Sequence, residues 1–116
     1  MCRADVTLYG IANCDTVRRA RRELGAAGVE HHFHDFRKNG LDPSTLDRWI
    51  AALGWEALLN RRGTTWRRLP PERREPLDAK RARELMLEEP TLIRRPVIEM
   101  DGEIHVGWAA DHPALR

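Results

Sequence analysis

A cysteine at the junction of a strand and a helix is the residue of this sequence best suited to chemistry. Cys14 follows a strand-sized apolar run at positions 6–11 and precedes an amphipathic helix that begins at Asp15. The free backbone N–H groups and the dipole at a helix N-terminus stabilise an anion. A cysteine placed there is more readily ionised than a free thiol, and the thiolate is the nucleophile. A free cysteine can also be a small buried apolar residue, so position alone leaves both interpretations open.

The residues around Cys14 act on it in opposite directions. Arg18 lies one helical turn further on, where its guanidinium could stabilise a thiolate, whereas the carboxylate of Asp15 opposes ionisation. Cys2 precedes the first strand, and we interpret it as an incidental thiol that could trap Cys14 in an artificial disulfide. Two cysteines are too few for a scaffold built on disulfides.

The elements that must position Cys14 form a strand, helix and strand unit. The apolar spacing predicts a helix from Asp15 to Ala26 or Ala27, with Gly28 as its C-terminal stop. Residues 29–36 read as a second strand, parallel to the first because a helix connects the two. His31, His32 and His34 fall in this strand, where alternation points them to opposite faces, so we predict no metal site.

The middle of the chain is predicted to be helical. Asp42 caps a helix that has Pro43 in its first turn and ends at Gly54. A short helix at 55–60, a polar loop at 61–65, a turn at 66–69 and a helix at 78–89 follow. Tryptophans at 49, 55 and 66 alternate with arginines, which could indicate stacking of single-stranded nucleic acid. Their helical spacing favours a role as core anchors instead.

The end of the chain is predicted to form a hairpin and a last short helix. A strand starts at Val97, Asp101 and Gly102 make a two-residue turn, and a return strand covers 103–106. The last helix follows Gly107 and contains Trp108.

Length and composition set the broad class. The 116 residues fit one domain, expected to span 1–116 as a monomer. The net charge is +2, and 18 of the 20 basic residues are arginines spread along the chain among acids. This balance gives no overall attraction to nucleic acid or membrane. Without a membrane helix or an apolar signal segment, we expect a soluble cytoplasmic protein.

Three motifs together resemble the ArsC family, over nearly the whole chain. They are Asn13-Cys14 with Arg18, the segment 54–69, and the segment 92–97 with Pro96. The family comprises glutaredoxin-linked arsenate reductases, Spx-type RNA polymerase regulators and YffB-type thiol reductases, and the middle segment is most similar to the YffB branch. The resemblance implies an α/β fold: a thioredoxin-like mixed sheet of about four strands with a helical insertion between strands two and three.

The resemblance also implies a function and a site. The expected function is a glutathione- or glutaredoxin-dependent monothiol oxidoreductase, with Cys14 as nucleophile facing a cis Pro96 and a mixed-disulfide intermediate. No bound cofactor is expected, and glutathione is the expected co-substrate. The remaining expected site residues are cationic or polar: Arg18 and Arg95 to stabilise the thiolate and bind an anionic group, Asn13 and Thr16 to donate hydrogen bonds to the sulfur, and Arg62 and Thr65, with Pro96, to bind substrate.

Two alternatives remain open. In the arsenate reductases three arginines bind the oxyanion; Arg95 matches one, whereas Asn60 and Gly107 stand at the other two positions and Gly10 replaces a histidine. Arsenate reduction is therefore expected to be weak. The tail from Val106 to Trp108 and Gly54 are closer to the Spx pattern, which raises RNA polymerase as a partner, but Val17 occupies the position of the second cysteine of the Spx switch.

Overall fold

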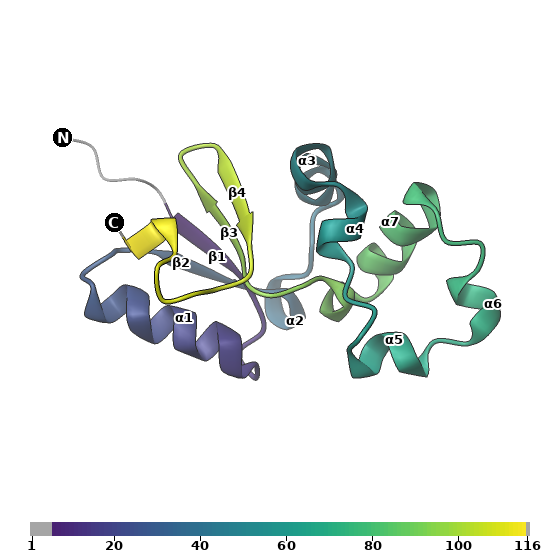
Figure 1. The fold of residues 1–116 in the computed structure, drawn as a ribbon, viewed down its shortest axis with the longest axis horizontal. Coiled ribbons are helices and arrows are strands. Elements are labelled where there is room, and N and C mark those ends of the chain that lie inside the picture. Colours follow the sequence, from purple (N-terminus) through teal and green to yellow (C-terminus); the bar gives the residue numbers. More distant parts are fainter. Residues whose placement is uncertain (1–5, 116) are drawn as a thin grey trace. The chain divides into compact units, whose positions relative to one another are not determined.

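The computed structural model describes residues 6–115, and the contacts among them form two compact units (Figure 1). The first contains residues 6–39 and 95–115, and the second contains Gly40–Arg94. The first unit holds the sheet and its helices, and the second is the helical insertion. Cys2 lies outside the described residues, and the expectations of a single domain and of a monomer stay predictions.

The first unit is built on a four-stranded mixed sheet. Its strands are β1 (Val6–Gly10), β2 (His32–Asp35), β3 (Val97–Met100) and β4 (Glu103–Val106), in the order β2-β1-β3-β4. β1 is parallel to β2 and antiparallel to β3, which is itself antiparallel to β4. The predicted thioredoxin-like α/β fold, with a helical insertion between strands two and three, is confirmed.

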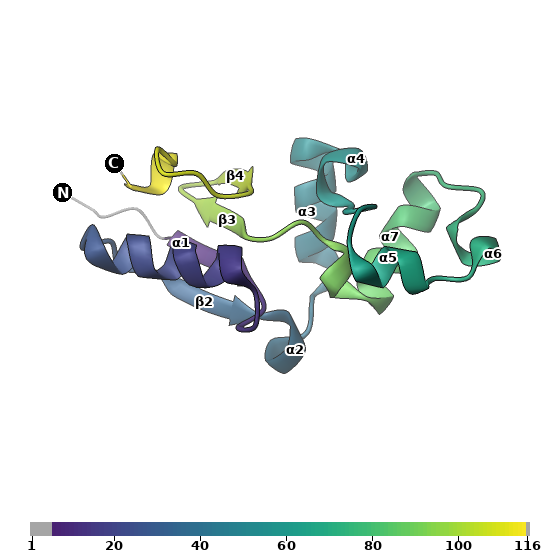
Figure 2. The ribbon, with the colours of Figure 1, turned by 60° about the horizontal axis from the view of Figure 1, so that its bottom comes forward.

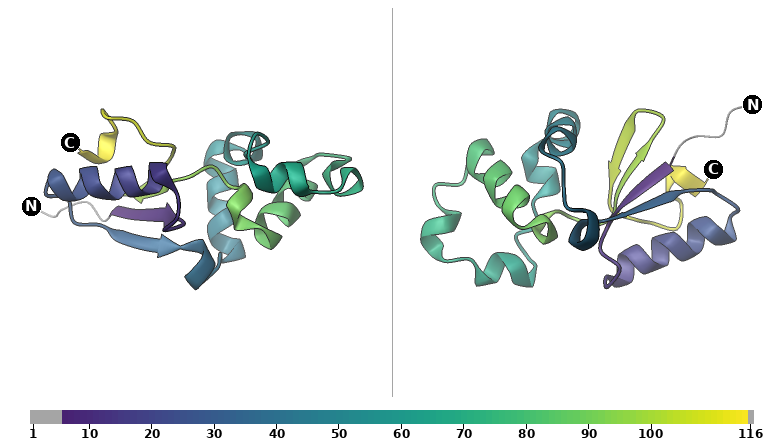
Figure 3. Two further views of the ribbon diagram at one scale, coloured as in Figure 1. Left: turned by 90° about the horizontal axis from the view of Figure 1, so that it is seen from below. Right: turned by 180° about the vertical axis from the view of Figure 1, so that it is seen from behind.

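The core of this unit lies between the sheet and α1 (Asp15–Ala26). Val17, Ala20 and Leu24, spaced three and four residues apart along α1, are fully buried. They meet Val6 and Leu8 of β1, Ile98 of β3 and Ala114 of the C-terminal turn η2 (Pro113–Leu115). Figure 3 (left) shows α1 and η2 on the same side of β1 and β2. Each buried Val or Leu side chain contributes about 1.5–3 kcal/mol, so this seam fixes the position of α1 on the sheet.

The second unit consists of short helices around buried apolar side chains (Figure 2). They are α3 (Pro43–Leu53), α4 (Trp55–Leu58), α5 (Thr64–Arg68), α6 (Pro71–Arg74), α7 (Ala79–Glu88) and the turn η1 (Pro90–Leu92). The Asp42 carboxylate accepts the Ser44 backbone N–H at 3.1 Å, as expected of an N-cap. A backbone bridge pairs Leu59, which follows α4, with Ile93 near the end of this unit.

Several predicted boundaries differ from the structure. β2 is shorter than the predicted 29–36, because the Asp35 carboxylate accepts the Arg37 N–H at 2.8 Å and starts the turn α2 (Phe36–Asn39). α6 lies between the turn predicted at 66–69 and the helix predicted at 78–89, where no helix was predicted; Pro71 suits a first helical turn. The last helical turn is η2, so Trp108 precedes it. Among residues 6–115, the helices are all too short or too polar to cross a membrane.

Candidate active site around Cys14

Cys14 occupies the N-cap position of α1. Its backbone is extended, with φ of −140° and ψ of 123°, and its carbonyl oxygen accepts the Arg18 N–H at 2.9 Å. The side chain makes no capping hydrogen bond to the helix and is only partly exposed, because it packs against the edge of the core. Cys14 therefore stands at the helix N-terminus, where backbone N–H groups are free, and its thiol is not sealed inside the protein.

The strand register brings Pro96 to the end of the sheet from which the Cys14 loop leaves. Tyr9 pairs with Val97, and Val97 pairs with Val106. One step further along the same register, Gly10 faces Pro96, and the Gly107 N–H donates to the Pro96 carbonyl oxygen at 2.8 Å. The Arg95–Pro96 peptide bond is cis, as the family resemblance implied.

Gly10 and Gly107 give this end of the sheet an unusually bare surface. A Cβ on Gly10 would lie 2.6 Å from Val17 Cγ2, closer than any real side-chain contact, so the strand needs glycine there. Gly107 has a φ of +91°, in the region that favours glycine. Neither position beside Pro96 can therefore add a cationic side chain without a change in the surrounding structure.

The guanidinium of Arg18 is engaged with a carboxylate. Its Nη2 donates to Oδ1 of Asp15, and the two side chains are 53% and 95% exposed. Such an exposed pair contributes only about 0–1 kcal/mol, so Arg18 is easily released to bind an anion. The structure thus places Arg18 beside the Cys14 turn but pairs its charge with Asp15.

The other predicted site residues fall into two groups. Asn13 and Thr16 are exposed next to Cys14 in the chain, and in the part that the structure describes neither side chain hydrogen-bonds to the sulfur. Arg95 immediately precedes the buried Pro96 in the first unit. Arg62 and Thr65 belong to the second unit. There, Arg62 donates its backbone N–H to Asn60 Oδ1 at 3.0 Å, and the Thr65 hydroxyl contacts that of Thr91 at 3.0 Å. Their predicted roles in catalysis and binding stay predictions.

Comparison with known proteins identifies the family. The sequence model of the ArsC family matches residues 9–113. This chain belongs to the ArsC family. An uncharacterised protein of Haemophilus influenzae is 43% identical over 103 residues, covering 89% of this chain and 90% of its own.

Solved structures of ArsC relatives share the fold. The structure titled YFFB (PA3664) protein is 44% identical with a TM-score of 0.88, covering 91% of this chain and 93% of its own. An arsenate reductase (ArsC) related protein from Brucella melitensis is 51% identical with a TM-score of 0.77, covering 91% and 88%. Arsenate reductase from Vibrio cholerae, at 20% identity and a TM-score of 0.78 over 91% and 92%, is similar in fold alone.

This ArsC chain also contains a cluster of rings that sequence reasoning missed. Trp108 donates its indole N–H to Glu23 Oε1 at 3.0 Å and stacks on His112, with ring centroids 4.7 Å apart. His112 is only 6% exposed, and His105 meets it edge-on at 5.3 Å. Burial, and secondly the nearby His105, lower the pKa of His112. Trp108 and His112 lie in irregular chain, where no periodicity indicates which side chains meet.

No metal centre emerges from the described residues 6–115. No three His, Cys, Asp or Glu side chains among them lie close enough to hold an ion. His34 instead contacts Tyr9, with the two rings tilted by 41° and their centroids 4.9 Å apart. The chemistry available at this site is therefore that of a partly exposed thiol at a helix N-terminus, on a loop that leaves the sheet at the end where Pro96 precedes β3.

Proposed function

We propose that this protein is a glutathione- or glutaredoxin-dependent monothiol oxidoreductase. One observation carries the proposal: Cys14, partly exposed, caps α1 at the sheet end where Pro96 enters. Membership of the ArsC family, with relatives named as arsenate reductases or related to them, supports a thiol-dependent reductase.

The proposed reaction is thiol–disulfide exchange. The Cys14 thiolate attacks one sulfur of a glutathionylated substrate, the substrate's S–S bond breaks, and the substrate leaves as a thiolate. A glutathione thiolate then attacks the mixed disulfide on Cys14, which releases oxidised glutathione and regenerates the Cys14 thiolate. The net reaction consumes one glutathione thiolate, releases the substrate thiolate and leaves the substrate's glutathione group in oxidised glutathione; where a glutaredoxin thiolate makes the second attack, that group leaves on glutaredoxin instead.

The remaining predicted site residues take supporting roles in this proposal. Arg18, once released from Asp15, and Arg95 bind a carboxylate of the glutathione moiety. Asn13 and Thr16 donate hydrogen bonds to the sulfur, while Pro96, Arg62 and Thr65 contact the substrate. The main-chain edge at Pro96 suits an extended thiol-bearing peptide, since such peptides are recognised through backbone hydrogen bonds.

Mass spectrometry of intact protein treated with glutathione disulfide tests the proposal. We expect one glutathione adduct on Cys14, formed faster than any adduct on Cys2 and removed by excess glutathione. Cys14→Ser should abolish the fast adduct, and the matched variant Cys2→Ser should keep it. Turnover of a glutathionylated peptide, coupled to glutathione reductase with and without a glutaredoxin, then identifies the reducing partner. An adduct that forms only on Cys2, or no Cys14-dependent turnover, would reject the mechanism.

Arsenate reduction is a weaker second candidate. It is favoured by the similarity to a protein named as arsenate reductase (ArsC) related. An arsenate oxyanion needs cationic donors, whereas Gly10 and Gly107 present none at the end of the sheet. We therefore propose little turnover of arsenate in a glutaredoxin-coupled assay, with Cys14→Ser as the control.

A Spx-type regulator is the alternative from another class. Val17, at the position of the second switch cysteine, is fully buried in the core. A pull-down with purified RNA polymerase distinguishes the oxidoreductase from the regulator. Binding of the polymerase to this protein, without Cys14-dependent turnover, would favour the regulator.

A further inference from the structure

The second unit contains a cavity that the proposed reaction does not use. It has a volume of about 380 Å³ and is lined by two basic residues, one acidic residue, and aromatic and apolar residues: Arg61, Trp66, Pro71, Arg74, Glu75 and Leu77. Its lining residues come from α5, from α6 and from the segments that precede α5 and follow α6. Its volume falls within the range of about 300–1,000 Å³ that small-molecule sites occupy, and apolar walls with a few charged groups are typical of such sites.

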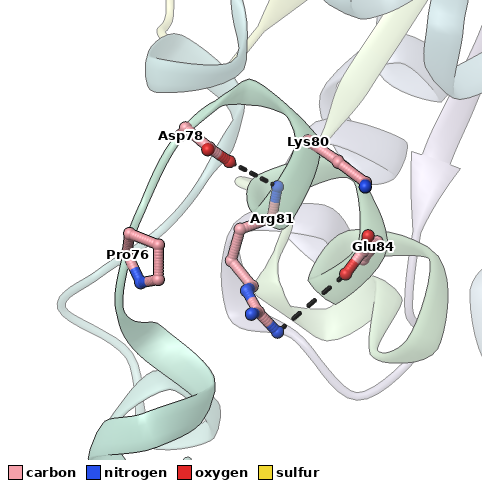
Figure 4. A pocket seen from close by; sticks show the side chains of 5 residues that line it. All are labelled: Pro76, Asp78, Lys80, Arg81 and Glu84. Carbon is pink, nitrogen blue, oxygen red and sulfur yellow. Dashed lines mark hydrogen bonds and ion pairs between the residues drawn. The ribbon is translucent and has the colours of Figure 1, made fainter.

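The two cavity arginines have no carboxylate partner. Within residues 6–115, neither Arg61 nor Arg74 forms an ion pair with an acidic side chain. A smaller hollow of about 120 Å³, formed by residues between 76 and 84, is different (Figure 4). There, the Asp78 carboxylate accepts the Arg81 backbone N–H at 2.8 Å, and the Arg81 guanidinium pairs with Glu84 at 3.9 Å. The larger cavity therefore offers two cations that form no ion pair among residues 6–115, with Glu75 as the one acidic residue of its described lining.

The segment that contains the cavity arginines is more positively charged than the chain as a whole. Residues 61–75 contain six arginines and two glutamates and carry a net charge of +4, although the whole chain carries only +2. The rest of the sequence is therefore slightly acidic. A local excess of positive charge raises the concentration of anions at this surface even when the protein as a whole is nearly neutral.

Trp66 gives the cavity an aromatic wall. Unlike Trp49, which is fully buried and a core anchor as predicted, Trp66 is only half-buried and lines the cavity. The guanidinium carbon of Arg74 lies over the indole, 5.8 Å from the ring centroid. This distance lies near the outer limit of a cation–π contact, which is about 6 Å to the centroid. Aromatic rings and guanidinium planes are the surfaces on which nucleobases stack.

We propose that this cavity is a nucleotide-binding site. The base stacks on the Trp66 indole, and the phosphate pairs with the guanidinium groups of Arg61 and Arg74. The same chemistry is offered by a free nucleoside monophosphate and by one nucleotide of a single strand. The site lies outside the Cys14 turn, and the inference is independent of the proposed oxidoreductase function.

Two-dimensional ¹H–¹⁵N NMR on the full-length protein tests the proposal, because the four tryptophans give separate indole N–H signals. Titration with adenosine 5′-monophosphate should shift the Trp66 signal saturably and leave those of Trp49 and Trp108 in place. Adenosine and ribose 5-phosphate, each lacking one half of the ligand, should bind more weakly. The last titration uses a short oligodeoxyadenylate. If it binds more tightly than the monophosphate, the ligand is a nucleotide within a single strand; if it binds equally or more weakly, the ligand is the free nucleotide.

Matched variants separate the site from non-specific charge. Trp66→Leu, followed through backbone signals near the cavity, and Arg74→Gln should each weaken binding about fivefold or more, since one base stack contributes roughly 5- to 150-fold. Arg81→Gln, which removes an arginine already paired with Glu84, should leave the affinity unchanged. Cys14→Ser should also bind normally, so failure here is distinguishable from failure of the oxidoreductase proposal.

Three results would overturn the inference. The first is that neither the monophosphate nor the oligonucleotide shifts the Trp66 signal. The second is that ribose 5-phosphate binds as tightly as the nucleotide, because no base stack is then formed. The third is that Arg81→Gln weakens binding as much as Arg74→Gln, because charge alone then accounts for it.

Discussion

Replacement of Gly10 by alanine should destabilise the protein, although the same change often stabilises. Gly10 lies in β1, and its φ is not positive, so alanine can adopt the same backbone conformation. By restricting the unfolded chain, alanine would raise the free energy of unfolding by about 0.4–1 kcal/mol. The added Cβ, however, would lie 2.6 Å from Val17 Cγ2, where ordinary contacts begin at 3.4 Å. Val17 is fully buried and β-branched, so it has few ways to move aside. Overpacking of this kind costs about 1–3 kcal/mol, which after that gain leaves a net loss of about 0–2.6 kcal/mol.

The double variant isolates the collision. Val17→Ala alone should cost about 1.5–3 kcal/mol, the value of burying a valine side chain. In the Gly10→Ala background the same change also relieves the clash, and the new methyl group fills part of the space that Val17 vacates. The combined loss should therefore be smaller than the sum of the single losses by about 1–2 kcal/mol.

Urea unfolding followed by far-ultraviolet circular dichroism measures these differences at constant m-value. Gly25→Ala is the matched control. Gly25 lies in α1, in the same unit as Gly10, and a Cβ there meets nothing within 4 Å. That variant should gain up to about 1 kcal/mol from helix propensity. We would reject the packing explanation if the Gly10→Ala protein were as stable as the Gly25→Ala protein. We would also reject it if the loss in the double variant equalled the sum of the two single losses.

Three further predictions concern charge and capping. Burial and the nearby His105 lower the pKa of His112 in the folded protein. In the unfolded chain this imidazole binds a proton near pH 6.5, whereas in the folded protein it stays neutral at that pH. Stability is therefore greatest above this pH and falls as the pH drops through it; urea midpoints should show the fall, and His112→Asn should lack it. Asp15→Asn removes the carboxylate that holds Arg18 and opposes a thiolate, so iodoacetamide should alkylate Cys14 about two- to fivefold faster at neutral pH; an unchanged rate would contradict the electrostatic role. Asp78→Ala removes the cap on the Arg81 N–H and should lower the urea midpoint by the equivalent of about 1 kcal/mol, and no loss would argue against the cap.

Local signals in the sequence were sufficient for the main elements. α1 runs from Asp15 to Ala26 as its apolar spacing predicted, and Gly28 follows with a φ of +74°. The Asp101-Gly102 turn joins β3 to β4, and both of its residues have positive φ. In each case the decisive interaction lies within a few residues, so the sequence pattern determines it directly.

Features that depend on distant residues were not predictable in the same way. The cis state of Pro96 was implied only by family resemblance. The pairing of Arg18 with Asp15 rather than with the sulfur is a choice between neighbouring partners that spacing leaves open. The burial of His112 depends on Trp108 and His105, which reach it from irregular chain and from β4. Trp66 shows the same limit, since helical spacing alone does not separate a core anchor from a cavity wall.

The end of the sheet around Cys14 constrains what this thiol can attack. Gly10 and Gly107 contribute only hydrogen atoms beside Pro96, and the nearest paired charges, on Asp15 and Arg18, cancel each other. A small oxyanion depends on several converging cations, which this arrangement does not provide at those positions. A disulfide carries no charge on its sulfurs, and a peptide that bears one can be held through main-chain hydrogen bonds. Under the proposed oxidoreductase function, a neutral sulfur substrate suits this arrangement, and Arg18, after leaving Asp15, would bind any anionic group of that substrate further out.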